Sequence, residues 1–407
     1  MNILIITNLY EPDFCGGAAL FTDLANGLAA RGHNVTVYAA YPYYPEWQDK
    51  SGDNGLRIHS EPVPAGNSPL VLRHGLFVPK NPGKLIPRVA YELSFFLSLL
   101  RSLFRGKKQD AVLVFCPMFG SVLFALCRKW LRREPVLLTV QDIPADAASA
   151  SGISKSRLFD RCANLLQSFV FNRMSAWSSI NQGMVDRLDA MKRTDIPLHF
   201  FPNWLTGPLA DSVKQVLASG KNSPSDKVQL LYCGNIGKKQ GLLDFCKLLQ
   251  ASDCEFDFQI RGEGAAANEV KTWVEEVADS RFRMSGFLND DEFIGAIANA
   301  DWFVITEKAG AGFSFIPSKL IPCISVGTPI LSICDKSGPL GKEVSDHNLG
   351  ISLNWTEAAN TADHFQQLYD RGKWQALRQS CLDRATIYQR DAAITNYEQA
   401  LSQVADS

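Results

Sequence analysis

Short apolar runs alternate with amphipathic helical patterns along the whole chain, and this alternation constrains the fold more than any other feature. It is typical of parallel sheets built from βαβ units. In the first half, strands are expected at 2–7, 34–39, 111–115, 135–140, 176–180 and from 198 onward, with helices at 18–31, 87–105, 120–131 and 157–173. In the second half, strands are expected at 228–234, 256–262, 282–287, 301–306, 329–334 and 350–353. The expected fold class is therefore α/β, with doubly wound, Rossmann-like sheets.

The chain divides into two domains by length and by pattern. Its 407 residues, 46% of them hydrophobic, suffice for two cores, since a domain usually holds roughly 100–200 residues. The strand pattern lapses between Trp204 and Val228, where residues 219–227 are polar and rich in turn formers. We expect domains at 1–204 and 205–407 that face each other across a ligand-binding cleft. Whether the last helix packs back on the first domain is left open.

The stretch LYCGNIGKKQGL, from Leu231 to Leu242, has the features of an anion site. A strand ends at Gly234, Asn235 follows, and a helix is expected to start near Gln240. Glycines let a ligand approach the backbone, and a helix N-terminus offers unpaired N–H groups. Lys238 and Lys239 add full positive charges. The pattern indicates a phosphate or diphosphate site, although many βα turns carry such residues for turn geometry and solvation alone.

A second segment in the same domain strengthens this hypothesis. In FSFIPSKL, Ser318 is expected to be the N-cap of a helix, with Lys319 in its first turn. A lysine at a helix N-terminus is unfavourable unless an anion is bound there. The loop before it, KAGAGF, carries Gly310 and Gly312. A weaker signal is the isolated G-x-G of the RGEG stretch, in which Gly262 and Gly264 follow Arg261.

These motifs and their spacing resemble family 4 of the retaining glycosyltransferases, which have the GT-B fold. The resemblance spans nearly the whole chain and includes the N-terminal segment with its glycine pair, FPNW at 201–204 and SVGTPIL from 325. More narrowly, YPYYPEWQ from 41, LFVPKNP from 76, VQD at 140–142, GNIGKKQGL and PSKL are similar to bacterial enzymes that build colanic-acid-type exopolysaccharide.

The resemblance implies transfer of a sugar from a nucleotide-sugar, with retention at the anomeric carbon and without a cofactor or metal ion. The donor diphosphate would lie near Gly234, Lys239 and the Ser318–Lys319 turn, and the base near Arg261–Gly264. The acceptor, a lipid-linked or free saccharide, would bind the first domain. Gly16 and Gly17 match the glycine pair that approaches the donor phosphates. The chain has no D-x-D motif, which agrees with lysines stabilising the leaving group.

The sequence departs from the family pattern where the donor sugar is held. Two glutamates eight positions apart would fall at Ser314 and Pro322, and neither is glutamate. Glu307 is acidic and nearby but out of register, and we expect it or Ser314 to take over part of the sugar contact. The usual arginine and histidine are replaced by Asn235 and Gln141.

The first domain offers a separate set of polar and aromatic candidates. Asp142 follows an apolar strand and is expected to orient an acceptor hydroxyl or the donor sugar, or else to cap the strand end. Tyr44, Glu46 and Trp47 belong to an aromatic loop that either stacks on the acceptor or covers the edge of the core. With Gln141, these residues form the candidate acceptor site. The candidate catalytic residues are Asp142, Glu307 and Lys239.

The first domain also carries a segment suited to a membrane surface. Residues 84–133 combine the apolar run 89–100 with an excess of basic over acidic side chains. The run is too short to span a bilayer, which takes about 20 apolar residues. We expect peripheral attachment to anionic lipid at the inner face of the cell membrane, against a buried helix with solvated ends as the alternative. The cysteines fit core thiols in a reducing cytoplasm, and no nucleic-acid motif accompanies the basic segment.

Three functions remain open on the sequence alone. The first is a hexosyltransferase type of enzyme in cell-surface or exopolysaccharide biosynthesis. The second is an epimerase of the same fold, which would act on a nucleotide-sugar without an acceptor. The third is a binder of nucleotide-sugars that has lost catalysis along with the paired glutamates.

Overall fold

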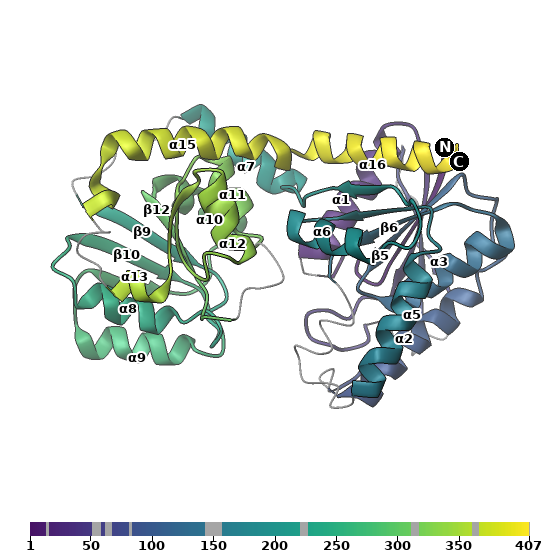
Figure 1. Ribbon diagram of the computed structural model, residues 1–407, viewed down its shortest axis with the longest axis horizontal. Helices are drawn as coiled ribbons and strands as arrows, with labels where there is room; N and C mark the ends of the chain where they lie inside the picture. Colours follow the sequence, from purple (N-terminus) through teal and green to yellow (C-terminus); the bar gives the residue numbers. More distant parts are fainter. Residues whose placement is uncertain are drawn as a thin grey trace. The chain divides into compact units, whose positions relative to one another are not determined.

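The computed structural model describes residues 1–13, 16–50, 58–61, 67–80, 84–142, 157–219, 227–310, 317–359 and 366–406. The chain forms two compact units (Figure 1). Unit 1 comprises Met1–Asn203 together with Asp391–Ser407, and unit 2 comprises Trp204–Arg390. The C-terminal helix therefore belongs to the same unit as the N-terminal strand.

Unit 1 is built on an eight-stranded sheet in the order β3-β4-β2-β1-β5-β6-β7-β8. Its strands are β1 (Asn2–Thr7), β2 (Asn34–Ala40), β3 (His59–Ser60), β4 (Leu70–His74), β5 (Ala111–Cys116), β6 (Val136–Val140), β7 (Ala176–Ser179) and β8 (Leu198–Phe200). Neighbouring strands run parallel, except that the edge strand β3 is antiparallel to β4. Strands β1 and β5 are buried almost throughout, as expected of a sheet covered on both faces.

Helices cover both faces of this sheet. They are α1 (Gly16–Ala30), α2 (Leu85–Leu100), α3 (Phe119–Arg132), α5 (Arg157–Phe171), α6 (Gln182–Met191) and α16 (Arg390–Ala405). Side chains of α2, α3, α5 and α6 share one apolar core with one face of the strands. On the opposite face, Phe21 of α1 stacks on Phe115 of β5, with ring centroids 3.8 Å apart. Tyr397 of α16 is buried there and interacts with Thr139 and Ser178.

Unit 2 holds a six-stranded parallel sheet in the order β11-β10-β9-β12-β13-β14. Its strands are β9 (Val228–Cys233), β10 (Phe256–Arg261), β11 (Phe282–Ser285), β12 (Trp302–Thr306), β13 (Ile330–Ile333) and β14 (Gly350–Leu353). Its helices are α7 (Gly207–Ser219), α8 (Leu242–Gln250), α9 (Ala267–Val277), α10 (Asp290–Asn299), α11 (Leu320–Ser325), α12 (Pro339–Asp346), α13 (Trp355–Ala359) and α15 (Arg371–Ala385), with short turns η1 (Gln366–Tyr369) and η2 (Thr386–Tyr388). Two apolar clusters, one on each face, fill the space between sheet and helices.

The expected fold class is confirmed, because both units are Rossmann-like parallel sheets wrapped by helices. Two strands were not expected from the sequence, β3 and β4. Strand β4 escapes a search for apolar runs because it ends in Arg73 and His74, both of which are buried. Arg73 is paired with Glu61 and also donates to backbone carbonyls of Glu11 and Ala40.

Strand order in each unit reverses at one point, and such a reversal leaves a crevice outside the carboxyl ends of two adjacent strands. In unit 1 the chain moves outward from β1 through β2 to β4, then returns to place β5 on the other side of β1. In unit 2 it moves from β9 to β10 and β11, then returns to place β12 beside β9. The carboxyl ends of β9 and β12 are therefore the expected ligand position in unit 2. Of the helices in the described part of the chain, none has the length and apolar content to cross a bilayer.

Candidate donor-binding site

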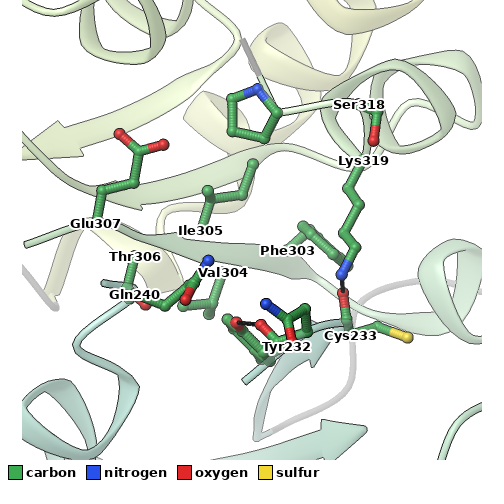
Figure 2. A pocket seen from close by; sticks show the side chains of 12 residues that line it. Tyr232, Cys233, Gln240, Phe303, Val304, Ile305, Thr306, Glu307, Ser318 and Lys319 are labelled. Atoms are coloured by element: carbon green, nitrogen blue, oxygen red, sulfur yellow. Dashed lines mark hydrogen bonds between the residues drawn. The ribbon is translucent and has the colours of Figure 1, made fainter. Parts of the chain in front are cut away.

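A pocket of about 270 Å³ opens at the carboxyl ends of β9 and β12 (Figure 2). Its lining comes from the end of β9, the loop after it, all but the first residue of β12 and the turn before α11. The lining residues are Tyr232, Cys233, Asn235, Gln240, Phe303, Val304, Ile305, Thr306, Glu307, Pro317, Ser318 and Lys319. The pocket lies where the strand order reverses, the position at which doubly wound sheets bind their ligands.

Lys319 places a cation inside this pocket. Figure 2 shows its side chain reaching from the turn before α11 to the end of β9, where its ammonium donates to the carbonyl oxygen of Cys233. Burial lowers the pKa of Lys319, because the charged form loses hydration. Among the residues that the structure describes, the Cys233 carbonyl is its one acceptor, whereas an ammonium carries three donors. The pocket therefore favours an anionic ligand.

Glycines at the end of β9 and β10 let two loops and a lysine meet. Gly234 has φ 140°, and a Cβ there would lie 0.8 Å from Nζ of Lys319. A Cβ on Gly262, which has φ 145°, would lie 1.8 Å from the carbonyl oxygen of Gly234. A Cβ on Gly264 would likewise lie 2.6 Å from the carbonyl oxygen of Ile236. The G-x-G at 262–264 thus has a clear packing role, and its contact with a nucleotide base stays a prediction.

Two buried polar atoms in the pocket lining have no hydrogen-bond partner among the described residues, Oγ1 of Thr306 and Oε1 of Gln240. Buried polar groups normally have partners, so these atoms are suited to a bound ligand or water. Burial also raises the pKa of the neighbouring Glu307, whose backbone carbonyl accepts from Nε1 of Trp355 at 2.8 Å. Figure 2 shows the Glu307 carboxylate on the other flank of the pocket from Lys319. Sequence reasoning missed Thr306 and Gln240, although both stand at predicted strand or motif ends.

The remaining second-domain candidates lie around this pocket. Asn235 lines it, and Lys238 and Lys239 are exposed on the loop that follows. Helix α8 begins at Leu242, after Gly241, two residues beyond Gln240, near which its start was expected. Arg261, which ends β10, is half-buried and accepts the amide of Gly234 through its carbonyl. Gly310 ends the described part of its loop with φ 77°, whereas the predicted contacts Gly312 and Ser314 lie outside the described residues.

One expectation about the PSKL turn is wrong. Ser318 does not cap a helix, because α11 begins at Leu320 and its boundary residue is Lys319, with no side-chain cap. The helix is only six residues long and contains Pro322. The position of Lys319 is therefore explained by its hydrogen bond to the Cys233 carbonyl, and the helix-dipole argument does not apply here.

The first-domain candidates lie at the carboxyl edge of the unit 1 sheet. Gly16 and Gly17 begin α1, and a Cβ on Gly17 would make only ordinary contact with Phe21. Gln141, directly after β6, forms a reciprocal amide pair with Asn203, at 3.1 and 3.2 Å. Asp142 follows it and is partly buried.

The aromatic loop packs mainly on the core of unit 1. Trp47 meets the rings of Tyr43 and Tyr91 at centroid distances of 5.5 and 5.8 Å, and Tyr44 touches Trp47. Glu46 is exposed and pairs with Lys50 at 2.7 Å. Covering of the core edge, one of the two roles considered for this loop, thus describes Trp47 well, and stacking on an acceptor stays a prediction.

A hydrogen-bonded cluster beside this loop was not identified from the sequence. Asn8, which follows β1, donates to the hydroxyls of Tyr43 and Tyr91 at 2.8 Å each, and these two hydroxyls lie 2.5 Å apart. Oδ1 of Asp13 accepts the amides of Tyr43 and Tyr44. The cluster stands where strand order reverses at β1 and β5, so polar atoms converge at the crevice position of this unit too.

Metal ligands do not gather in the described ranges, where no group of three or more His, Cys, Asp or Glu side chains could hold an ion. The cysteines that the structure describes are all unpaired thiols, and most are buried.

The comparisons with known proteins agree with this geometry. Residues 16–204 match the family model described as Glycosyl transferase 4-like domain. WcaI of Escherichia coli strain K12, named as a colanic acid biosynthesis glycosyl transferase, is 27% identical over 342 residues, which cover 80% of this chain and 82% of WcaI. Among solved structures, sucrose-phosphate synthase from Thermosynechococcus elongatus matches all of both chains with a TM-score of 0.69 at 15% identity. Anabaena HepE, solved with UDP and glucose, matches 99% of each chain with a TM-score of 0.62 at 14% identity.

These matches define the class as a glycosyltransferase with the GT-B fold, and residues 16–204 are similar to the family-4 type. Within that class it is related to the colanic acid biosynthesis enzyme WcaI. The predicted resemblance to family-4 glycosyltransferases and the predicted enzyme class are thereby confirmed.

Proposed function

We propose that this glycosyltransferase moves a sugar, with retention at the anomeric carbon, from a nucleotide-sugar to a lipid-linked or saccharide acceptor in exopolysaccharide biosynthesis. The observation that carries the donor assignment is the half-buried ammonium of Lys319 in the pocket at the ends of β9 and β12. HepE, which shares the fold, was solved with UDP and glucose, and WcaI is named for colanic acid biosynthesis. Both support a nucleotide-sugar donor and a polysaccharide product.

Electrostatics supplies the main catalytic effect in this proposal. The bond between the anomeric carbon and the diphosphate oxygen breaks, a bond to the acceptor oxygen forms on the same face, and the acceptor hydroxyl passes its proton to the leaving diphosphate. Negative charge develops on the diphosphate, and prepositioned cations and N–H groups stabilise it. Lys319 and Lys239 provide the cations, and the backbone around Gly234 allows the close approach. No metal ion takes part in the proposed reaction.

Carboxylates hold the two sugars. Glu307 contacts donor hydroxyls from the flank of the pocket opposite Lys319, and Asp142 orients the acceptor hydroxyl from the end of β6. The acceptor lies at the carboxyl edge of the unit 1 sheet, near Gln141 and the aromatic loop. The enzyme works at the inner face of the cell membrane, where a lipid-linked acceptor is carried in the bilayer.

The test begins with a panel of nucleotide-sugars in a thermal-shift assay, since a ligand raises stability by RT ln(1 + [L]/Kd). Each ligand found is then incubated with membrane extract and chelator, and release of nucleoside diphosphate is measured. The anomeric configuration of the product is read by NMR. Transfer with retention in the presence of chelator supports the proposal. Conversion of the donor without an acceptor would identify an epimerase, and binding without turnover over long incubation would identify a binder.

Lysine variants test the donor site itself. Lys319→Met and Lys239→Ala should each weaken nucleoside diphosphate binding by about 1.5–3 kcal/mol, the range for a charge-assisted hydrogen bond. Lys238→Ala should have a smaller effect, and Lys214→Ala on the exposed surface of α7 is the control. A larger effect at Lys238 than at Lys239 would contradict the assignment of the loop.

A further inference from the structure

Helix α2 has apolar side chains on two opposite faces. Tyr91, Phe95 and Leu99 are buried in the core of unit 1. The residues Ile86, Val89, Leu93 and Leu97 recur every three or four positions, so they form a second stripe on the outward face. Their exposed fractions are 82, 49, 51 and 53%. A surface helix normally has a polar outward face, so this stripe is not explained by the folding of unit 1.

Neighbouring helices extend the stripe. Helix α3 packs against both α2 and α5, and Figure 1 shows the three helices on the same side of unit 1. Exposed large apolar side chains lie on each of them and on the turn after α2. We call the following set the apolar face: Ile86, Val89, Leu93, Leu97, Phe104, Trp130, Leu131, Leu165, Leu166 and Phe169. Single exposed apolar residues are ordinary, but a gathering of this size marks an interaction surface.

The charges along α2 and the turn after it are mostly positive. Cations stand at both ends of α2, at Lys84, Arg88, Arg101, Arg105, Lys107 and Lys108, against the single acidic residue Glu92 over 84–108. Burial raises the pKa of Glu92 to about 7, which reduces its negative charge near neutral pH. Anionic lipid headgroups attract such cations, and acyl chains accept the apolar residues between them. A protein partner would need a matching acidic rim and apolar centre, whereas an anionic bilayer supplies both.

The basic residues of α3 do not serve this surface as the sequence suggested. Arg128 is fully buried and paired with Glu134 at 2.5 Å. Arg132 also pairs with Glu134 and donates to carbonyl groups of the turn that follows α2. Lys129 donates to the carbonyl of Arg173 at 2.7 Å. These cations hold unit 1 together, so the expectation that the basic side chains of 84–133 contact lipid is wrong for Arg128.

We propose that the apolar face inserts into the interfacial layer of an anionic lipid bilayer, with α2 lying along the surface and the cations at its ends contacting headgroups. The inference deepens the proposed function, because it rests on a lipid-linked acceptor as the reason for membrane attachment. Insertion of apolar side chains of α2, α3 and α5 supplies most of the binding free energy, and the cations contribute less.

The experiment measures sedimentation of the full chain with vesicles of phosphatidylcholine alone or mixed with phosphatidylglycerol. The chain should bind the mixed vesicles, and part of the binding should persist at high salt, because salt screens charges but not apolar insertion. The triple variant Ile86→Glu, Val89→Glu, Leu93→Glu should reduce partitioning about tenfold or more, since each inserted side chain is replaced by a charge. Leu217→Glu and Phe287→Glu, at exposed apolar positions of unit 2, are the matched controls.

A second set of variants separates insertion from charge. Replacing Lys84, Lys107 and Lys108 with Ala should weaken binding at low salt and change little at high salt. Vesicle binding that is lost when these lysines are replaced, but is unchanged in the triple variant, would contradict insertion of the apolar face. Absence of vesicle binding would overturn the whole inference, as would a dimer in solution that the triple variant dissociates, because the face would then contact a second copy.

The readouts distinguish this inference from the proposed function. The triple variant should keep the unfolding temperature and the nucleotide-sugar thermal shift of the unmodified chain, because it alters neither core nor pocket. Loss of vesicle binding in that variant supports the inference even if no donor is turned over. Conversely, transfer to an acceptor without any vesicle binding would support the proposed reaction and contradict insertion of the apolar face into a bilayer.

Discussion

At the scale of single residues, the donor site depends on a glycine whose neighbours come from distant parts of the chain. Gly234 leaves room for the ammonium of Lys319, 85 positions later, and for the turn of Gly262. The sequence shows a glycine followed by lysines at a strand end, which predicts an anion site. It cannot show that the cation inside the pocket comes from Lys319, because that contact is made only when β9 and β12 lie side by side.

Gly234→Ala is expected to destabilise unit 2 and to lower nucleotide affinity together. An alanine would have to adopt φ 140°, which costs of the order of 1–3 kcal/mol, and its Cβ would displace the Lys319 ammonium. Chemical unfolding and nucleoside diphosphate titration measure the two effects. Gly286→Ala is the matched control, because no atom lies within 4 Å of a Cβ at that position. An unchanged affinity in Gly234→Ala would show that Lys319 does not contact the ligand.

The sequence alone also gives a wrong location for the charge of Arg128, which is buried rather than exposed. The excess of basic residues over 84–133 predicts a basic surface, yet Arg128 of this segment is buried against Glu134, six positions later. Burial of an arginine is favourable only with a paired carboxylate and further acceptors, and the carbonyls of Ser102 and Leu103 supply these. Those carbonyls belong to the turn after α2, whose position relative to α3 is set by tertiary packing. The sequence therefore contains both partners but not the evidence that they meet.

At the scale of elements, α2 carries a residue that completes the start of α3. The N-cap of α3, Met118, offers no side-chain acceptor, and Oε2 of Glu92 accepts the amide of Gly120 at 3.0 Å instead. The first amides of a helix need such partners. Burial raises the pKa of Glu92 to about 7, and the amides of Gly120 and Phe119 and the charge of Arg88 act in the opposite direction.

This contact predicts a pH dependence of stability. Between about pH 4.5 and pH 7 the folded state holds a proton on Glu92 that the unfolded chain has lost, so the free energy of unfolding should fall as pH rises. The fall is at most about 3 kcal/mol, at 1.36 kcal/mol for each unit of pKa. Glu92→Gln keeps an acceptor oxygen for Gly120 and should remove this slope. Urea unfolding across this pH range measures it, and Glu46→Gln, at an exposed carboxylate, should leave the slope in place. A slope unaffected by Glu92→Gln would contradict the assignment.

Elements differ in how far their patterns reveal them. All strands of unit 2 were predicted, some from continuous apolar runs, as in β12, and others from alternation of apolar and polar residues, as in β10. Strand β4 was missed because its polar residues Arg73 and His74 are satisfied by tertiary partners. Helix α2 was predicted, but an apolar run does not say which of its side chains face the core. Only the packing of Phe95 and Leu99 against the sheet reveals Ile86 and Leu93 as an outward stripe.

At the scale of the molecule, both units repeat one device, a parallel sheet whose strand order reverses beside its first strand. The alternation of strands and helices predicts parallel sheets and places ligands at the carboxyl ends of strands. It does not determine strand order, so the sequence alone could not select the pair β9 and β12 as the pocket. The candidates in unit 2 lie together because β9 and β12 are neighbours in the sheet. The cluster of Asn8, Tyr43 and Tyr91 could be identified only once the strand order of unit 1 was known.

The C-terminal helix α16 packs in unit 1, although it follows unit 2 in the sequence. Tyr397 is 1% exposed and lies 4.8 Å from the ring of Phe201. Glu398 accepts from Arg31 and contacts His33, both at 2.7 Å. Each large side chain buried by α16 contributes roughly 1.5–3 kcal/mol, against about 5–15 kcal/mol for the net stability of a typical domain. The helix is therefore a structural part of unit 1.

Removing residues 390–407 should accordingly unfold or loosen unit 1 while unit 2 keeps its donor pocket. Hydrogen exchange should increase in β6 and β7, whose Thr139 and Ser178 interact with Tyr397, and stay unchanged in β9 and β12. Nucleoside diphosphate titration of the same truncated chain should still show binding, because every described residue of the pocket precedes the deletion. A lower affinity would then measure the predicted contribution of Gly16 and Gly17 of unit 1. A chain lacking only 406–407 is the control, since α16 ends at Ala405. Faster exchange in unit 2 with an unchanged unit 1 would show that α16 stabilises the other half of the molecule.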